Sequence, residues 1–87
     1  MSDEPLCVVV CESIHDMLAV ERTVKQAKLW CDLVPTPRQV SSDCGMALSV
    51  HLADLGQIAG LLAEEQKRYI GIFQEAERGY TLIHKPS

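Results

Sequence analysis

The sequence predicts an α+β domain of the ferredoxin-like class: a βαββαβ sandwich with a four-stranded antiparallel sheet and two helices on one face. Three observations favour this class. β-Branched runs and amphipathic stretches follow one another in the order strand, helix, strand, strand, helix, strand. The 87 residues suffice for one small domain, and a 47% hydrophobic content suffices for one core. We therefore expect one domain over residues 1–87, with a tail at 1–5, a core at 6–74 and an extension at 75–87.

The first half of the chain predicts a strand, a helix and a second strand. Residues 6–11 form an apolar, β-branched run. Ser13 with Asp16 three positions later matches a capping box in which Asp replaces Glu. Apolar residues then recur every three or four positions, which predicts a helix ending near residue 28 or 29. Residues 31–34 form a short strand that Pro35 stops, because proline has no amide hydrogen to donate.

The second half repeats the unit after a polar loop. Residues 46–50 predict a third strand, residues 52–66 an amphipathic helix, and residues 69–73 a fourth strand. Gly56 and Gly60 share one face of that helix, which suggests close approach of the helix to the sheet. Residues 75–87 read as a polar turn, a short apolar patch and a mobile end.

One face of the predicted sheet is left without helices. The first and third strands are the most continuously apolar and are expected at the centre, with the second and fourth at the edges. An apolar open face invites a homodimer partner or a larger protein. The alternative is that residues 80–83 fold back over it. The residues expected on this face are Cys7, Val9, Cys11, Ala47, Ser49, Tyr69 and Phe73.

Composition argues against several classes of function. The net charge of −4 and the scattered basic residues argue against binding of RNA or DNA. The acidic start lacks the features of a secretory signal, and no segment approaches the roughly 20 apolar residues that span a bilayer. We therefore expect a cytoplasmic protein without membrane contact.

No cofactor or metal is expected either. His15, His51 and His84 lack ligand-like spacing to one another or to a cysteine. No glycine-rich phosphate loop is present in the sequence. His15 and Asp16 could form a catalytic pair with Cys44, but a solvated or capping role is commoner for a histidine in the first turn of a helix.

Three of the four cysteines fit a structural role. Cys7 and Cys11 lie roughly 13 Å apart along one face of a strand, too far for a disulfide or a shared metal. Cys31 opens the second strand. Because unpaired cysteine is among the most buried residue types, we expect all three in the core.

Cys44 is the exception, because it ends a polar loop that contains Pro37 and Arg38. The hydroxyls of Ser41 and Ser42 and the Gly45 amide could donate hydrogen bonds to a thiolate, while Arg38 would stabilise that thiolate and Asp43 would oppose it. Gly45 would let a partner approach the sulfur closely. A structural role is equally open, in which Cys44 is the buried start of the third strand and Gly45 forms a bulge.

The loop from Pro37-Arg38 through two serines to Cys44-Gly45, leading into an apolar strand, resembles that of the selenium/sulfur carrier protein-like family. The similarity runs from about Val8 to Phe73. The resemblance implies a small cytoplasmic domain in which Cys44 holds sulfur or selenium as a persulfide or selenosulfide, with Pro37, Arg38, Ser42 and Gly45 as its surroundings. The other cysteines and the extension after Phe73 depart from the motif.

The leading hypothesis is therefore a carrier rather than an enzyme. Cys44 would accept a chalcogen from a donor such as a cysteine desulfurase and pass it to an acceptor enzyme, supported by Ser41 and the other loop residues. A second hypothesis is an interaction or regulatory module in which Cys44 is structural. A third is thiol-redox sensing through Cys44 and Cys31, which requires their Cα atoms to lie within about 7 Å.

Overall fold

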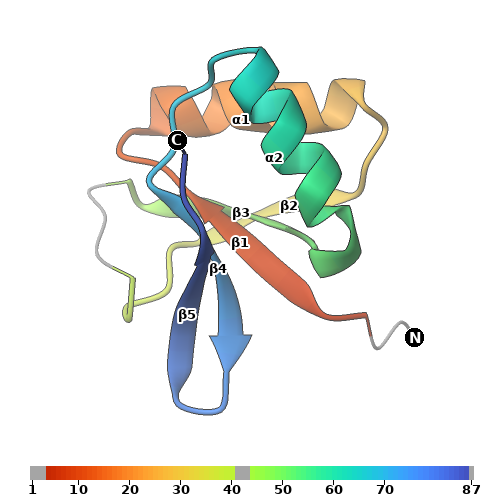
Figure 1. Ribbon diagram of the computed structural model, residues 1–87. Helices are drawn as coiled ribbons and strands as arrows, with labels where there is room; N and C mark the ends of the chain where they lie inside the picture. Colours follow the sequence, from red (N-terminus) through yellow and green to blue (C-terminus); the bar gives the residue numbers. More distant parts are fainter. Residues whose placement is uncertain (1–3, 41–43, 87) are drawn as a thin grey trace.

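The computed structural model describes residues 4–40 and 44–86, which form an α+β fold with both helices on one side of an antiparallel sheet (Figure 1). The α+β class and the predicted element order are confirmed up to the fourth strand. The elements are β1 (Leu6–Val10), α1 (Ile14–Gln26), β2 (Cys31–Pro35), β3 (Met46–His51), the short 3₁₀ helix η1 (Leu52–Asp54), α2 (Leu55–Glu64), β4 (Gly71–Ala76) and β5 (Gly79–His84).

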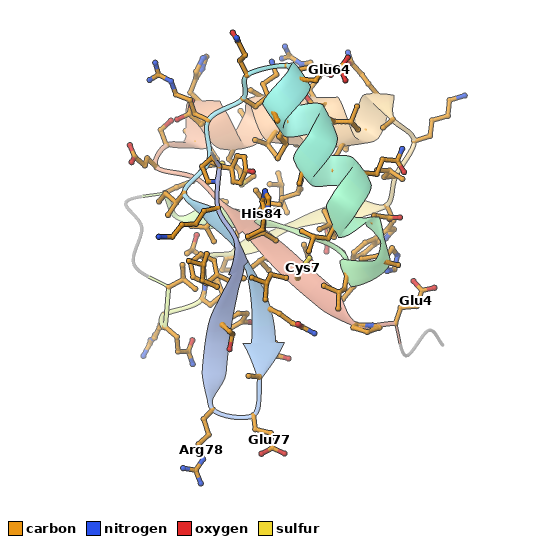
Figure 2. The ribbon with its side chains drawn as sticks, in the orientation of Figure 1. Glu4, Cys7, Glu64, Glu77, Arg78 and His84 are labelled. Carbon is orange, nitrogen blue, oxygen red and sulfur yellow. The ribbon has the colours of Figure 1, made fainter. Side chains whose placement is uncertain are left out.

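The sheet has five strands in the order β2-β3-β1-β4-β5, so the prediction of four strands was wrong. β1 and β3 are inner strands and β2 is an edge, as expected. β4 is not an edge, because β5 pairs with it from Ala76↔Gly79 to Ile72↔His84. Gly79 has a φ of +132°, a conformation that favours glycine and closes the hairpin. The turn Glu77-Arg78-Gly79 was the sequence signal for this hairpin, and Figure 2 shows Glu77 and Arg78 at its tip.

The start of α1 follows the predicted cap. Ser13 has an extended backbone, and its hydroxyl oxygen accepts a hydrogen bond of 3.1 Å from the Asp16 amide. The helix then buries one stripe against the sheet. This stripe and the facing strands form the helix-side core, whose fully buried members are Cys7, Val9, Cys11, Met17, Val20, Val24, Leu48, Val50, Ile58, Leu62 and Ile72.

Cys7, Val9 and Cys11 therefore face the helices, and their expected place on the open face was wrong. Residues directly opposite in an antiparallel pair share a face. The register pairs Val8 with Ser49, so the open face takes the even positions of β1 and the odd positions of β3. If the register of β1 shifted by one residue, the side chains on its two faces would change places. The hydrophobic pattern of β1 does not determine the register, because both its odd-numbered and its even-numbered residues are apolar.

The open face carries a smaller cluster around Val8, Val10 and Ala47. Val40, from the segment after β2, is buried in this cluster, and Phe73 and Tyr80 from the β4–β5 hairpin pack against it. The expected return of residues 80–83 over this face is thus seen in part: Tyr80 packs here, whereas Ile83 packs against the helix-side core. The open face is covered by a loop and a hairpin instead of helices.

The glycines of α2 do not serve close packing, contrary to the prediction. Gly56 and Gly60 are exposed, and a Cβ added to either would meet no atom within 4 Å. Gly71 in β4 has the close approach instead, because a Cβ there would lie 2.6 Å from Leu82 Cδ1 and 3.2 Å from the His84 carbonyl oxygen. A side chain at position 71 would therefore require the Leu82 side chain to move and the backbone at His84 to shift by a few tenths of an ångström.

Candidate functional site

Cys44 lies immediately before β3, at the end of the sheet where β2 finishes. The Thr36 hydroxyl donates to the Cys44 carbonyl at 2.8 Å, and the Thr36 amide donates to the Gly45 carbonyl at 3.1 Å. These bonds continue the β2–β3 pairing past Pro35↔Met46. The main chain of residues 44 and 45 is thereby held against the start of the loop.

The Cys44 side chain is buried in the helix-side core, with 3% of its surface exposed. Its thiol donates to the Met46 carbonyl oxygen, with 3.2 Å between Sγ and O. The burial matches the structural alternative from the sequence. Gly45 beside it is exposed, and a Cβ there would meet no atom within 4 Å. A partner could therefore reach the backbone next to Cys44 without obstruction by a side chain at position 45.

The supporting residues predicted for Cys44 lie in different places. Arg38 is exposed. The Val40 amide donates to the Pro37 carbonyl at 3.0 Å, which makes a turn that delivers Val40 to the open-face cluster. Cys44 packs on the opposite face of the sheet. Ser41 and Ser42 lie outside the described residues, as does Asp43.

Cys11 is the residue near Cys44 that the sequence did not identify. It follows Val10, which ends β1 and pairs with Ala47. Its thiol is fully buried and donates to the Arg68 carbonyl oxygen, with 3.6 Å between Sγ and O. Burial raises the pKa of Cys11 to about 12, with smaller contributions from Asp16 and from Cys44. Its core role was predicted, but its proximity to Cys44 depends on strand register and loop position.

The remaining two cysteines occupy the other end of the sheet. Cys7 and Cys31 both pair with Val50, whereas Pro35 pairs with Met46. The four residue steps from Cys31 to Pro35 span roughly 13 Å of strand, which puts Cys31 out of disulfide reach of Cys44. The redox pair of Cys44 and Cys31 was therefore a wrong prediction.

Cys7 lies between β1 and α2 (Figure 2). Burial raises the pKa of Cys7 to about 11, and the charge of Asp54 adds to the rise. Burial also raises the pKa of Cys31, which is only partly exposed. The thiols of Cys7, Cys11 and Cys31 are therefore protonated at neutral pH. Neither Cys7 nor Cys31 lies at the end of the sheet that holds Cys44.

The histidines do not complete a site around Cys44. His15 is exposed in the first turn of α1. His51 ends β3, where its Nδ1 lies 2.7 Å from Glu4 Oε2 and its ring centroid lies 4.7 Å from that of Trp30. His84 stacks on Tyr69 with 6.2 Å between centroids. Across residues 4–40 and 44–86, no group of three or more His, Cys, Asp or Glu side chains could hold a metal ion.

Surface depressions lie on both sides of the sheet. One of about 510 Å³ lies over the open face, where Val8, Ser49, Glu75 and Tyr80 are among its lining residues. Another of about 300 Å³ lies beside Cys11 and is lined by Glu12, Asp16, Lys67, Arg68, Tyr69 and Pro86. Within the part of the chain that the structure describes, no helix is long and apolar enough to cross a membrane.

A family model covers the loop, the thiol and the surrounding fold. It matches residues 6–74, from the start of β1 into β4, and its description is "Putative Se/S carrier protein-like". The chain belongs to this family. The resemblance inferred from the Cys44 loop is thereby confirmed. The comparison with curated proteins found no match, and the comparison with solved structures found none either.

Proposed function

We propose that this protein is a non-enzymatic carrier that holds sulfur or selenium on Cys44 as a persulfide or selenosulfide. The observation that carries the proposal is the family match over residues 6–74, which includes Cys44 and Gly45. The exposed Gly45 supports it, because a docking partner meets no side chain there. Cys44 has this neighbour, whereas Cys7, Cys11 and Cys31 do not.

The transfer consists of two thiol exchanges. The Cys44 thiolate attacks the outer sulfur of a donor persulfide, a new S–S bond forms, and the donor thiolate leaves. A nucleophile of the acceptor enzyme then attacks the outer sulfur on Cys44, and the Cys44 thiolate leaves. The thiolate is the reactive form, so loading requires loss of the S–H bond to the Met46 carbonyl. Because Cys44 is buried, we infer that partner docking exposes the sulfur.

The remaining features of the proposal follow from this chemistry. The donor would be a protein such as a cysteine desulfurase, and the carrier and its partners would meet in the cytoplasm. Arg38 and Pro37, with Ser41 and Ser42, would contact the partner or the loaded sulfur once the loop is displaced. Because no substrate pocket or general base is needed, a single domain suffices.

We further infer that β1 to β4 form a ferredoxin-like unit to which β5 is added, since their order in the sheet is β2-β3-β1-β4. The open face of this unit is the surface we propose for homodimer formation or for docking onto the acceptor. The depression over Val8 and Ser49 supports this, because the helices leave it uncovered. Sedimentation as a monomer at high concentration would argue against the dimer.

Chalcogen loading tests the carrier function. The reduced protein is incubated with a cysteine desulfurase and cysteine, or with selenocysteine in place of cysteine in a parallel sample, and peptides are then mapped by mass spectrometry. We expect one added sulfur or selenium on Cys44 and none after Cys44→Ser. Cys31→Ser is the matched control, because it removes a cysteine that is more exposed than Cys44. This variant should still load Cys44, and Cys31 of the wild-type protein should carry no chalcogen. Loading on Cys31 alone, or on no cysteine, would overturn the proposal.

The burial of Cys44 favours one alternative, an interaction module in which this thiol is structural. The two functions separate in the Cys44→Ser variant. A carrier loses transfer while it keeps its fold and partners, whereas an interaction module keeps its function. Binding of the partner before and after the substitution, measured together with loading, distinguishes them.

A further inference from the structure

Cys11 and Cys44 are diagonal neighbours on the helix face of the sheet. The register pairs Val10 with Ala47, so one step further Cys11 stands opposite Met46. Cys44 precedes Met46 by two residues, and both cysteines belong to the helix-side core. Diagonal neighbours across an antiparallel pair are about 7–8 Å apart. The two thiols therefore lie near each other at one end of the sheet.

A persulfide on Cys44 makes Sγ of this residue open to attack by a second thiolate, because the outer sulfur can leave as sulfide. A disulfide between the two residues needs their Cβ atoms within about 4.5 Å, so residue 44 must move by a few ångströms. A Cβ added to the exposed Gly45 next to it would meet no atom within 4 Å, so no side chain at position 45 obstructs the shift.

We propose that Cys11 is the resolving thiol of the Cys44 carrier site and discharges a stranded persulfide as sulfide. The proposal rests on the carrier function above. Sulfur of the Cys11 thiolate attacks Sγ of Cys44, the bond from Sγ to the outer sulfur breaks, and the outer sulfur leaves with the electron pair. Cys11–SH and Cys44–S–SH thus become a Cys11–Cys44 disulfide and H₂S. The outer sulfur is reduced to sulfide and the Cys11 sulfur is oxidised, while the Cys44 sulfur keeps its oxidation state, so no further oxidant is needed.

The surroundings of Cys11 make this discharge slow at neutral pH. The thiol is fully buried and donates to the Arg68 carbonyl. Its pKa is raised to about 12, chiefly by burial, so the attacking thiolate is scarce at pH 7. The loaded protein then has time to meet an acceptor. Below that pKa the thiolate fraction, and with it the rate, rises roughly tenfold per pH unit.

Cys7 provides a matched control within the same core. It lies in β1, which Cys11 follows directly, packs in the same helix-side core, is equally buried, and has a pKa raised to about 11. It pairs with Val50, at the opposite end of β3 from Met46. A general effect of removing a core thiol would be seen in both Cys7→Ser and Cys11→Ser. Loss of a resolving thiol would be seen only in Cys11→Ser.

The experiment loads wild type, Cys11→Ser and Cys7→Ser as above, removes the donor, and follows sulfide release between pH 7 and pH 9. Peptide mapping under non-reducing conditions identifies any disulfide. We expect wild type and Cys7→Ser to release sulfide with formation of a Cys11–Cys44 disulfide, about tenfold faster per pH unit. Cys11→Ser should retain its persulfide. Equal release from Cys11→Ser, or a disulfide that lacks Cys11, would overturn the inference.

Diamide oxidation of the unloaded wild-type protein tests the same assignment without any variant, so its result does not depend on whether Cys11→Ser folds. It should give the Cys11–Cys44 disulfide as the main intramolecular product, and a product without Cys11 would contradict the assignment. The two proposals fail differently. Absence of any chalcogen on Cys44 overturns the carrier function and with it the exchange step. Loading of Cys44 without a later Cys11–Cys44 disulfide overturns the resolving role alone.

Discussion

The two faces of the sheet are covered by different means. On the helix side, α1 and α2 bury a continuous core that includes Leu48, Ile58 and three of the four cysteines as buried members. On the open side, one buried loop residue, Val40, and the β4–β5 hairpin cover a small cluster around Val10 and Ala47. The open side also has a depression of about 510 Å³, which Val8 and Ser49 line.

This difference shows how stability and recognition are distributed. Apolar area that is fully removed from water stabilises the fold in proportion to its extent, which favours the helix side. A partly covered face leaves apolar surface for a partner. We therefore expect substitutions on the helix side to lower stability most. Substitutions on the open side should have smaller effects on folding and larger effects on association.

Leu48→Ala should have the largest effect. Leu48 is fully buried among the helix-side residues, so its truncation should lower the free energy of unfolding by about 2–5 kcal/mol. Leu82→Ala is the matched control, because Leu82 is 39% exposed on β5. Urea denaturation of both variants measures the difference. A similar loss for the two would show that the faces do not differ as described.

Alkaline pH should destabilise the helix side next. The pKa values of Cys7 and Cys11 are raised from 9.0 to about 11 and about 12, chiefly by burial. A raised pKa in the folded state stabilises below pH 9, and this contribution is lost as the pH rises toward the folded value. Each thiol should account for up to roughly 2–3 kcal/mol between pH 9 and pH 11.

Denaturant melts across this range measure the loss. The double variant Cys7→Ala/Cys11→Ala should show a flatter pH profile than wild type, and Cys31→Ala, which removes a partly exposed thiol, should flatten it less. An unchanged slope in the double variant would contradict the assignment of the pH dependence to these two groups.

Gly71→Ala should disrupt the cover of the open face. The added Cβ would lie 2.6 Å from Leu82 Cδ1 and 3.2 Å from the His84 carbonyl, so β5 must shift away from β4. We expect a loss of about 1–3 kcal/mol. Faster amide hydrogen exchange confined to β4 and β5 would confirm the local cause, whereas uniform loss of protection would point to a global one.

Val40→Ala should have a smaller effect on the same face. Val40 is 6% exposed, and loss of two buried carbons at about 0.8 kcal/mol each predicts about 1.6 kcal/mol. Its neighbour Gln39 is exposed, so Gln39→Ala should change stability by less than about 0.5 kcal/mol. Thermal unfolding of the pair measures whether the loop truly contributes to the cover.

Gly60→Ala should have the smallest effect and the opposite sign. Gly60 is exposed within α2, and an added Cβ meets no atom within 4 Å. Alanine should therefore stabilise the helix by about 0.5–1 kcal/mol. A loss of stability would instead support the interpretation from the sequence, in which the glycines allow the helix to approach the sheet closely. Because the substitution adds only a methyl group to an exposed surface, loading of Cys44 should be unaffected.

Local signals identified most of the elements. The Ser13 cap and the spacing of apolar residues located α1, and Pro35 marked the end of β2, because these features depend on neighbours within a few residues. The hairpin of β4 and β5 was missed, although Gly79 and the apolar residues after it carried a turn signal. The β5 strand lies beyond the unit formed by β1 to β4 and is stabilised mainly by its pairing with β4. Such pairing between strands leaves little signal in the local sequence.

The sequence by itself determined the α+β class, the family and the loop that contains Cys44, because periodicity, turn residues and a short motif are local. Only the tertiary structure decided which parity of β1 faces the helices, that Cys44 is buried with its thiol on the Met46 carbonyl, and that Cys11 stands near it. These facts depend on strand register and loop packing. A one-residue shift in register would exchange the faces without any change in the residues themselves.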